Sequence, residues 1–209
     1  MTAQKPSKLI YVGDPMCSWC YGIAEELSEV KKTFGDQIDF EMVMGGLRPY
    51  NTQTMSELKD FLSHHWEEVN SKSGQIFTYS ILDSQEITYD TEPPCRASII
   101  VRSIDREKEF NFFKAVQKAF YFDNKNLHLK ESYHPILKEL SIDTQTFDKL
   151  FDSPNANEKS NEDFNRARTL GVNSFPTLLL EHDRKQHKIA QGFETSENMI
   201  RAIRKIVSQ

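Results

Sequence analysis

Apolar and polar positions follow two different periods along the first fifty residues. Residues 9–12 form a short apolar run before Gly13, which predicts a buried strand. Apolar residues then recur every three or four positions as far as Phe34, which predicts an amphipathic helix that Gly35 ends. Residues 38–44 alternate with a period of two and predict a second strand. Strand, helix and strand in this order predict a βαβ unit with parallel strands.

The middle of the chain is predicted to be helical. Five stretches carry an apolar stripe at helical spacing, and the strongly aromatic one is expected to place its rings in a core. The stretches are 55–69, 97–104, 110–120, 133–140 and 147–151. The aromatic residues expected in the core are Phe112, Phe113, Phe120, Tyr121 and Phe122. Because no strand pattern interrupts these stretches, we expect a small bundle of helices.

The end of the chain returns to an α/β pattern. A helix is predicted over 162–170, with Gly171 as its cap. Pro176 precedes an apolar strand, where a residue without an N–H group belongs at the start. A polar hairpin loop over 182–187 leads to a partner strand, and an amphipathic helix over 199–206 follows. The predicted order is therefore β-β-α.

Together these elements predict an α/β fold that a helical domain interrupts. Residues 1–50 form the first part of the α/β unit, 51–160 the inserted all-α domain and 161–209 the second part. A chain of 209 residues is long enough for this arrangement.

Charge and cysteine content narrow the class of protein. The net charge is −5, and no block of Lys and Arg occurs, which argues against nucleic acid or an acidic membrane surface as partner. The polar N-terminus lacks the apolar core of a signal peptide, and no run is long enough to span a membrane. We therefore expect a cytoplasmic protein. Three cysteines in such a protein are typical of a reactive pair plus one further thiol, rather than of a disulfide framework.

The reactive pair is Cys17 and Cys20, which open the first predicted helix. Free N–H groups at a helix N-terminus favour a thiolate, so Cys17 is expected to attack. Cys20 lies one turn further on and can close a disulfide with it, so Cys20 is expected to resolve. A structural zinc site needs four ligands, and the chain has neither a second CxxC nor a His pair at zinc-binding spacing, so no metal is expected.

Two motifs give the chain a resemblance to a known family. The first is DPMCSWCYG at 14–22, and the second is Phe175-Pro176-Thr177 at the start of a strand. The combination resembles the thioredoxin fold, β-α-β followed by β-β-α, as split by helices in the DsbA family. The motif EPPCRA at 92–97 is similar to the intracellular FrnE-like branch. The resemblance covers nearly the whole chain.

The resemblance implies roles for individual residues. It makes Cys17 the attacking thiol, Cys20 the resolving thiol and Pro176 a cis-proline packed beside them. It also implies that the backbone of Phe175 pairs with an extended substrate segment. The expected activity is that of a thiol–disulfide oxidoreductase of the protein disulfide reductase or isomerase type. No metal or organic cofactor is expected, glutathione is a candidate co-substrate, and the protein is expected to be a monomer or a homodimer.

Four further residues near the motifs carry alternatives. Trp19 is expected to present apolar surface to a substrate, and Ser18 and Trp19 together to tune the reduction potential. Asp14 could relay protons to Cys20, although Asp before Pro is also an ordinary turn residue. Cys95 could be a third redox thiol, although free cysteines are usually just buried.

Two other functions stay open from the sequence. Kappa-class glutathione transferases and 2-hydroxychromene-2-carboxylate isomerases share the split fold, but they use a single serine or no thiol pair, so Cys17 and Cys20 argue against them. A redox-sensing module that binds a partner protein would be oxidised once without turnover. A disulfide-reductase assay separates such a sensor from an enzyme.

Overall fold

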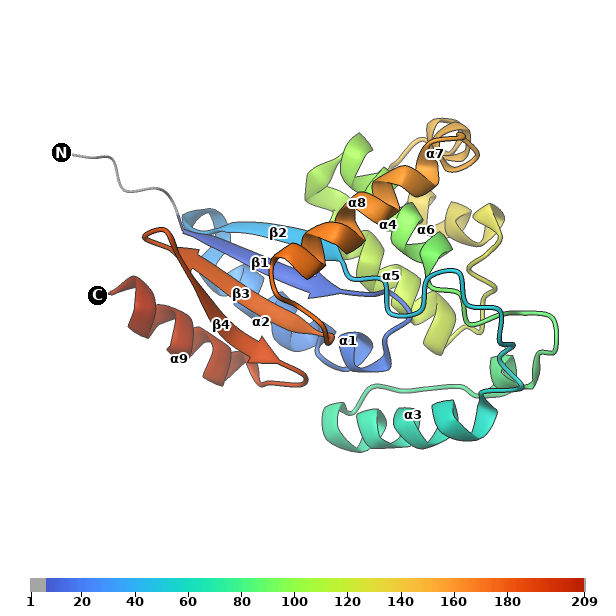
Figure 1. Ribbon diagram of the computed structural model, residues 1–209, viewed down its shortest axis with the longest axis horizontal. Helices are drawn as coiled ribbons and strands as arrows, with labels where there is room; N and C mark the ends of the chain where they lie inside the picture. The colour runs from blue at the N-terminus through green and yellow to red at the C-terminus, as the bar shows by residue number, and fades with distance from the viewer. Residues whose placement is uncertain (1–6, 209) are drawn as a thin grey trace.

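A four-stranded sheet lies at the centre of the computed structural model, which describes residues 7–208 (Figure 1). Residues 1–6 of the polar N-terminus therefore lie outside the described residues. The strands lie in the order β2-β1-β3-β4. β1 runs parallel to β2 and antiparallel to β3, and β3 and β4 form an antiparallel hairpin. The strands are β1 (Lys8–Gly13), β2 (Asp39–Met44), β3 (Thr177–His182) and β4 (Lys185–Gln191).

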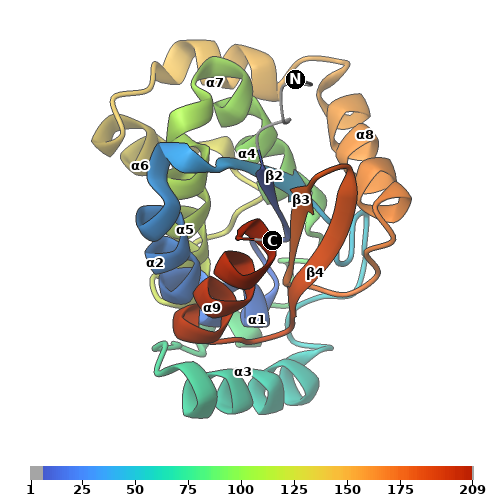
Figure 2. The ribbon, with the colours of Figure 1, turned by 90° about the vertical axis from the view of Figure 1, so that its left-hand side faces the viewer.

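Helices cover both faces of this sheet. α2 and α9 pack on one face, and α8 packs on the other (Figure 2). The helices at the two ends of the α/β unit are α1 (Ser18–Gly22), α2 (Ala24–Phe34), α8 (Ala156–Thr169) and α9 (Ser196–Val207). Those between β2 and α8 are α3 (Lys59–Ser73), α4 (Glu92–Ile104), α5 (Glu109–Tyr121), α6 (His134–Glu139) and α7 (Thr144–Phe151). The predicted order, β-α-β, then helices, then β-β-α, is confirmed.

The position of β1, between β2 and β3, explains the sequence pattern of this strand. Leu9 and Tyr11 face α2 and α9, whereas Ile10 and Val12 face α8. Because both faces of β1 are buried, the strand reads as a continuous apolar run instead of an alternating one. The strand therefore anchors the following turn firmly in the core.

The inserted helices have a core of their own, rich in aromatic rings. Trp66 of α3 and Tyr121 of α5 pack with ring centroids 5.1 Å apart. Four of the five aromatic residues predicted to lie in the core are buried, but the fifth, Phe122, is 40% exposed. It follows the last residue of α5 as its C-cap, so its side chain is no longer held on the buried face of the helix. Phe113 is buried but packs in the cluster that contains Tyr11 instead.

Several predicted boundaries were wrong. The helix after the thiol pair is divided at Ile23 into α1 and α2, although Ile23 keeps a right-handed conformation (φ −85°, ψ −5°). Residues 74–91 contain no α-helix, only the short 3₁₀ helix Ser80–Asp83. α8 begins at Ala156, six positions before the predicted start at residue 162. Its first half is polar and lacks the apolar stripe on which the prediction relied.

The hairpin loop is also shorter than predicted. Only Asp183 and Arg184 connect β3 to β4, and both have positive φ angles, 48° and 62°. Two such residues form a tight turn that matches the twist of a hairpin. Glycine or asparagine usually marks this turn, and their absence hid it in the sequence.

The predicted boundary between residues 160 and 161 falls within α8. This helix packs on α4 of the insertion and on β2 of the sheet. Asp163 of α8 illustrates the link, because it accepts a hydrogen bond from the backbone N–H of Met44 and one from Arg102 of α4.

Candidate active site

Cys17 lies where the chain leaves β1 and enters α1. Its backbone has the extended conformation of an N-cap (φ −87°, ψ 115°), and its N–H donates to the carbonyl of Asp14 at 3.1 Å. Its thiol lies 3.7 Å from the carbonyl oxygen of Phe175. Cys17 is 5% exposed, whereas Cys20 and Cys95 are 0% exposed. Of the three thiols, Cys17 is therefore the one that a reagent can reach.

Cys20 lies behind Cys17 in the core. Both thiols are free, so the structure shows the reduced pair. Burial raises the pKa of the Cys20 thiol well above its usual value, and the adjacent Cys17 raises it further. The hydroxyl of Tyr11 acts in the opposite direction on this pKa, because a hydrogen bond donated by it would stabilise the thiolate.

The segment Phe175-Pro176 faces Cys17 from the other end of the sequence. Its peptide bond is cis. Phe175 is half-buried, and its ring covers Gly45, where a Cβ atom would come within 2.1 Å of ring carbon Cε1. Gly45, at the end of β2, is thus required for the position of Phe175. In the sequence, Gly45 and Gly46 only mark the end of the alternating pattern of residues 38–44 and do not indicate this contact.

Asp14 is fully buried beside the pair, and its carboxyl group organises the turn. Its Oδ1 accepts the N–H of Met16 at 2.8 Å, which forms an Asx turn. Its Oδ2 accepts the N–H of Leu47 at 2.7 Å and the thiol of Cys95 at 3.4 Å. Burial raises the pKa of Asp14, and these hydrogen bonds oppose the rise.

Cys95 lies in the first turn of α4, a helix whose residues are mostly buried. Burial raises the pKa of its thiol well above the usual value, and the nearby Asp14 carboxyl raises it further. Cys95 therefore sits as a neutral hydrogen-bond donor at the back of the site, close to the turn that carries Cys17.

The residues between the two thiols differ in exposure. Ser18 is 8% exposed, and Trp19 is half-buried. Trp19 packs against both the sheet core and the insertion core. The next residue but one, Tyr21, stacks on Tyr121 of α5 at 4.9 Å with an interplanar angle of 11°. The helix α1 is therefore held between the two cores.

Two buried tyrosines near the site were not singled out from the sequence. The hydroxyl of Tyr89 donates to the carbonyl of Met16 at 2.5 Å and so fixes the turn before Cys17. Tyr11 is buried in the cluster that contains Cys20. For Tyr11 the sequence did carry a signal, because a tyrosine in an otherwise aliphatic buried strand needs a partner for its hydroxyl.

The described residues show no metal-binding cluster and no membrane-spanning helix. Within 7–208, no three His, Cys, Asp or Glu side chains are grouped as metal ligands. None of the helices in that range is long and apolar enough to cross a bilayer.

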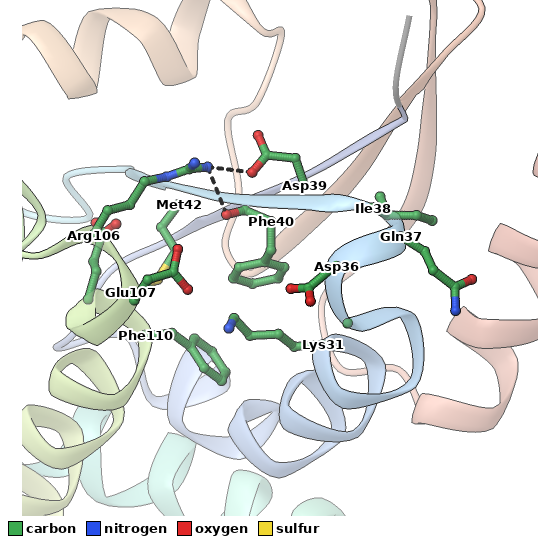
Figure 3. Close-up of a pocket in the computed structure, with 12 residues that line it drawn as sticks. Lys31, Asp36, Gln37, Ile38, Asp39, Phe40, Met42, Arg106, Glu107 and Phe110 are labelled. Atoms are coloured by element: carbon green, nitrogen blue, oxygen red, sulfur yellow. Dashed lines mark hydrogen bonds and ion pairs between the residues drawn. The ribbon is translucent and has the colours of Figure 1, made fainter. Parts of the chain in front are cut away.

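A hollow of about 310 Å³ lies away from the thiols, between the end of α2, β2 and the start of α5 (Figure 3). Its charged groups are largely engaged with their neighbours. Arg106 binds Asp39 and the carbonyl of Phe40, and Lys31 lies 5.9 Å from the centre of the Phe40 ring. It contains none of the residues that the sequence singled out.

Comparison with known proteins identifies the family. A family model described as thioredoxin matches residues 10–199. The chain belongs to the thioredoxin family. A solved structure of a candidate protein disulfide isomerase from Nitrosomonas europaea is 29% identical, covers 98% of this chain and 99% of its own, and has a TM-score of 0.89. The predicted thioredoxin fold with a DsbA-like helical insertion is thereby confirmed.

Two further relatives are more distant in sequence. The cytosolic disulfide reductase DsbM from Pseudomonas aeruginosa has a TM-score of 0.80 at 21% identity, over 96% of this chain and 98% of its own. It has also been solved with GSH. The ClpXP adapter protein SpxH of Bacillus subtilis is 20% identical over 178 residues, which are 84% of this chain. The match spans only 58% of the length of SpxH.

Proposed function

We propose that this thioredoxin-family protein is a disulfide reductase that uses Cys17 and Cys20 as a dithiol. The observation that carries the proposal is the position of the Cys17 thiol, at a helix start and 3.7 Å from the carbonyl of Phe175, with Cys20 buried behind it. The proteins of similar fold include a named disulfide reductase and a candidate disulfide isomerase, which supports disulfide chemistry.

The cycle has two exchange steps. In the first, the Cys17 thiolate attacks a substrate disulfide, an S–S bond to Cys17 forms, and one substrate thiolate leaves. In the second, the Cys20 thiolate attacks the sulfur of Cys17, the Cys17–Cys20 disulfide forms, and the second substrate thiolate leaves. The dithiol loses two electrons and two protons, and the substrate disulfide gains them and becomes two thiols.

The substrate is expected to pair with Phe175. Among the described residues, its backbone N–H donates no hydrogen bond, so the group is free for an extended peptide. Pro176 has no N–H of its own and leaves this pairing to Phe175. Trp19 offers apolar surface beside the thiols, and Ser18 and Trp19 separate the two sulfurs and so influence the potential.

Glutathione is the co-substrate that we propose for recycling, with the cytoplasm as the compartment. Support comes from the cytosolic relative DsbM, which has been solved with GSH. A role of Asp14 as a proton relay to Cys20 finds less support, because its side chain bonds to Met16, Leu47 and Cys95 instead. A role of Cys95 as a third redox thiol finds less support, because its thiol is fully buried and donates to Asp14.

The direction of transfer is tested by the reduction potential. Wild-type protein is equilibrated in glutathione buffers, and the fraction of the pair that is oxidised is measured by mass after acid quenching and alkylation. A potential near that of thioredoxin, about −270 mV, supports reduction. A potential near about −120 mV, the range of DsbA, contradicts it and indicates an oxidase.

Activity is tested by the reduction of insulin with dithiothreitol or glutathione as electron source. Cys17→Ser is expected to abolish catalysis, because it removes the one thiol of the three that has any exposed surface. Cys95→Ser is the matched control, since it replaces a fully buried thiol and retains a donor for Asp14. Full activity of Cys17→Ser would overturn the assignment.

A redox-sensing adapter is the second candidate, and the similarity to SpxH favours it. In that case the pair would be oxidised once and would control binding to another protein. Consumption of one equivalent of disulfide, without turnover in excess reductant, would establish this candidate in place of the reductase.

A further inference from the structure

Tyr11 is a buried polar residue in the strand that leads to the thiol pair. It is 1% exposed, and its ring packs edge-to-face against Phe113 with centroids 5.9 Å apart. A phenylalanine would satisfy this packing equally well. The hydroxyl therefore requires an explanation separate from the ring.

The hydroxyl has no hydrogen-bond partner among the described residues. Leaving a buried polar group unpaired costs free energy, so such groups are rare. Tyr11 packs in the same buried cluster as Cys17 and Cys20, and the Cys20 thiol contributes to the raised pKa of Tyr11. Tyr11 thus shares a cluster with the thiol that the reaction later converts to a thiolate.

Gly13 provides the space for this arrangement. A Cβ atom at Gly13 would come within 2.6 Å of the Tyr11 hydroxyl oxygen. The glycine therefore leaves room for the hydroxyl over the end of β1, the end from which the chain turns into α1.

We propose that Tyr11 acts on the resolving thiol: its hydroxyl donates a hydrogen bond to the sulfur of Cys20 as this sulfur becomes a thiolate and attacks the mixed disulfide. The inference rests on the proposed function, because it assigns a residue to the second exchange step. A charged acceptor strengthens a hydrogen bond, so the interaction is weak in the resting thiol and strong where the reaction needs it.

The chemistry of the second step fixes what Tyr11 does. The Cys20 thiol loses its proton, its sulfur forms a bond to Cys17, the bond from Cys17 to the substrate sulfur breaks, and the leaving thiolate takes up a proton. Burial and the neighbouring thiols raise the pKa of Tyr11 well above its usual value. Tyr11 therefore keeps its proton throughout and serves as a donor, not as the base.

The test separates the two exchange steps in one trace. Reduced protein is mixed with dithiobis(nitrobenzoate) in a stopped-flow instrument, and the coloured thionitrobenzoate is followed. Attack by Cys17 releases one equivalent, and attack by Cys20 on the resulting mixed disulfide releases a second. Cys95 is 0% exposed and is counted separately after unfolding.

In Tyr11→Phe we expect an unchanged first phase and a second phase slowed about tenfold or more, the effect of losing one hydrogen bond to a charged group. Tyr133→Phe is the control, because Tyr133 is also a fully buried tyrosine, but it packs in the insertion core and its hydroxyl donates to the carbonyl of Leu127. It is expected to leave both phases unchanged.

Three results would contradict the inference. An unchanged second phase in Tyr11→Phe would show that the hydroxyl is merely unpaired, and the variant would then gain stability. Equal slowing of both phases would indicate a general disturbance of the site. Wild-type protein that releases only one equivalent would overturn the proposed dithiol function itself, a failure that is distinct from the first two.

Discussion

The thiol of Cys95 donates a hydrogen bond to the carboxyl group of Asp14 at 3.4 Å, across 81 positions of the chain. Asp14 also accepts the N–H of Leu47, so three segments meet at one carboxyl group. The segments are the turn before the reactive pair, the loop after β2 and helix α4. This contact joins the insertion to the turn that sets the position of Cys17.

Substitution of Cys95 tests whether the contact is structural. Cys95→Ala removes the donor and is expected to lower the free energy of unfolding by about 1 kcal/mol, as measured by urea denaturation. Cys95→Ser keeps a donor and is expected to retain insulin-reductase activity within about twofold. A Cys95→Ser variant that is stable but inactive would instead make Cys95 a redox thiol.

Substitution of Cys20 tests the order of the thiols. Cys20→Ser leaves Cys17 able to attack but unable to complete the cycle, so mixed disulfides with substrate or glutathione should accumulate. Mass spectrometry of the protein after incubation with oxidised glutathione detects the added glutathionyl group. If Cys17→Ser forms the adduct and Cys20→Ser does not, the roles are reversed.

Gly45 is predicted to control the position of Phe175. In Gly45→Ala the new methyl group overlaps the Phe175 ring, which must move. We expect a loss of about 1–3 kcal/mol in unfolding free energy, typical of overpacking, together with lower insulin-reductase activity. The double variant Gly45→Ala/Phe175→Leu should recover part of the stability, and simple addition of the two single effects would argue against contact between the residues.

Glu109 is predicted to make stability depend on pH. It is 3% exposed and lies 3.4 Å from Arg102, with Arg106, Asp163 and Glu41 as its other charged neighbours. Burial raises its pKa from 4.5 to about 8, although Arg102 opposes the rise. Between these values the folded protein holds a proton that the unfolded chain has lost. The stability that this proton supplies is complete below pH 4.5 and disappears as the pH rises to about 8.

Glu109→Gln isolates this contribution, because an amide does not titrate. Over that pH range, wild-type protein should lose up to about 1.4 kcal/mol per pH unit relative to the variant, measured by urea denaturation at several pH values. A constant difference between the two proteins from pH 5 to pH 8 would refute the prediction.

The sequence allowed the order of elements and the two motifs to be predicted, because both depend on local patterns. Residues 9–12 are apolar on both faces of a strand, and Pro176 can only begin the strand that follows it. Cys17 and Cys20 are three positions apart, about one helical turn, so their proximity follows from their spacing alone.

What could not be predicted depends on contacts between distant segments. Nothing local links Asp14 to Cys95, or Gly45 to Phe175, because these pairs form only when the insertion and the two ends of the chain pack together. The turn at Asp183 and Arg184 was missed for another reason, since tertiary pairing of β3 and β4 imposes positive φ angles on residues that rarely adopt them.

The position of α1 between two cores has a thermodynamic consequence. Tyr21 stacks on Tyr121 in the insertion, whereas Cys17 and Cys20 pack in the sheet core. The position of this short helix therefore depends on the packing of both cores. Any aromatic residue of the insertion that supports the reduced and oxidised forms unequally therefore shifts the potential, by about 30 mV for each 1.4 kcal/mol of difference. The tendency of the Cys17–Cys20 disulfide to accept electrons is therefore a property of the whole molecule, and residues that make no contact with either sulfur can change it.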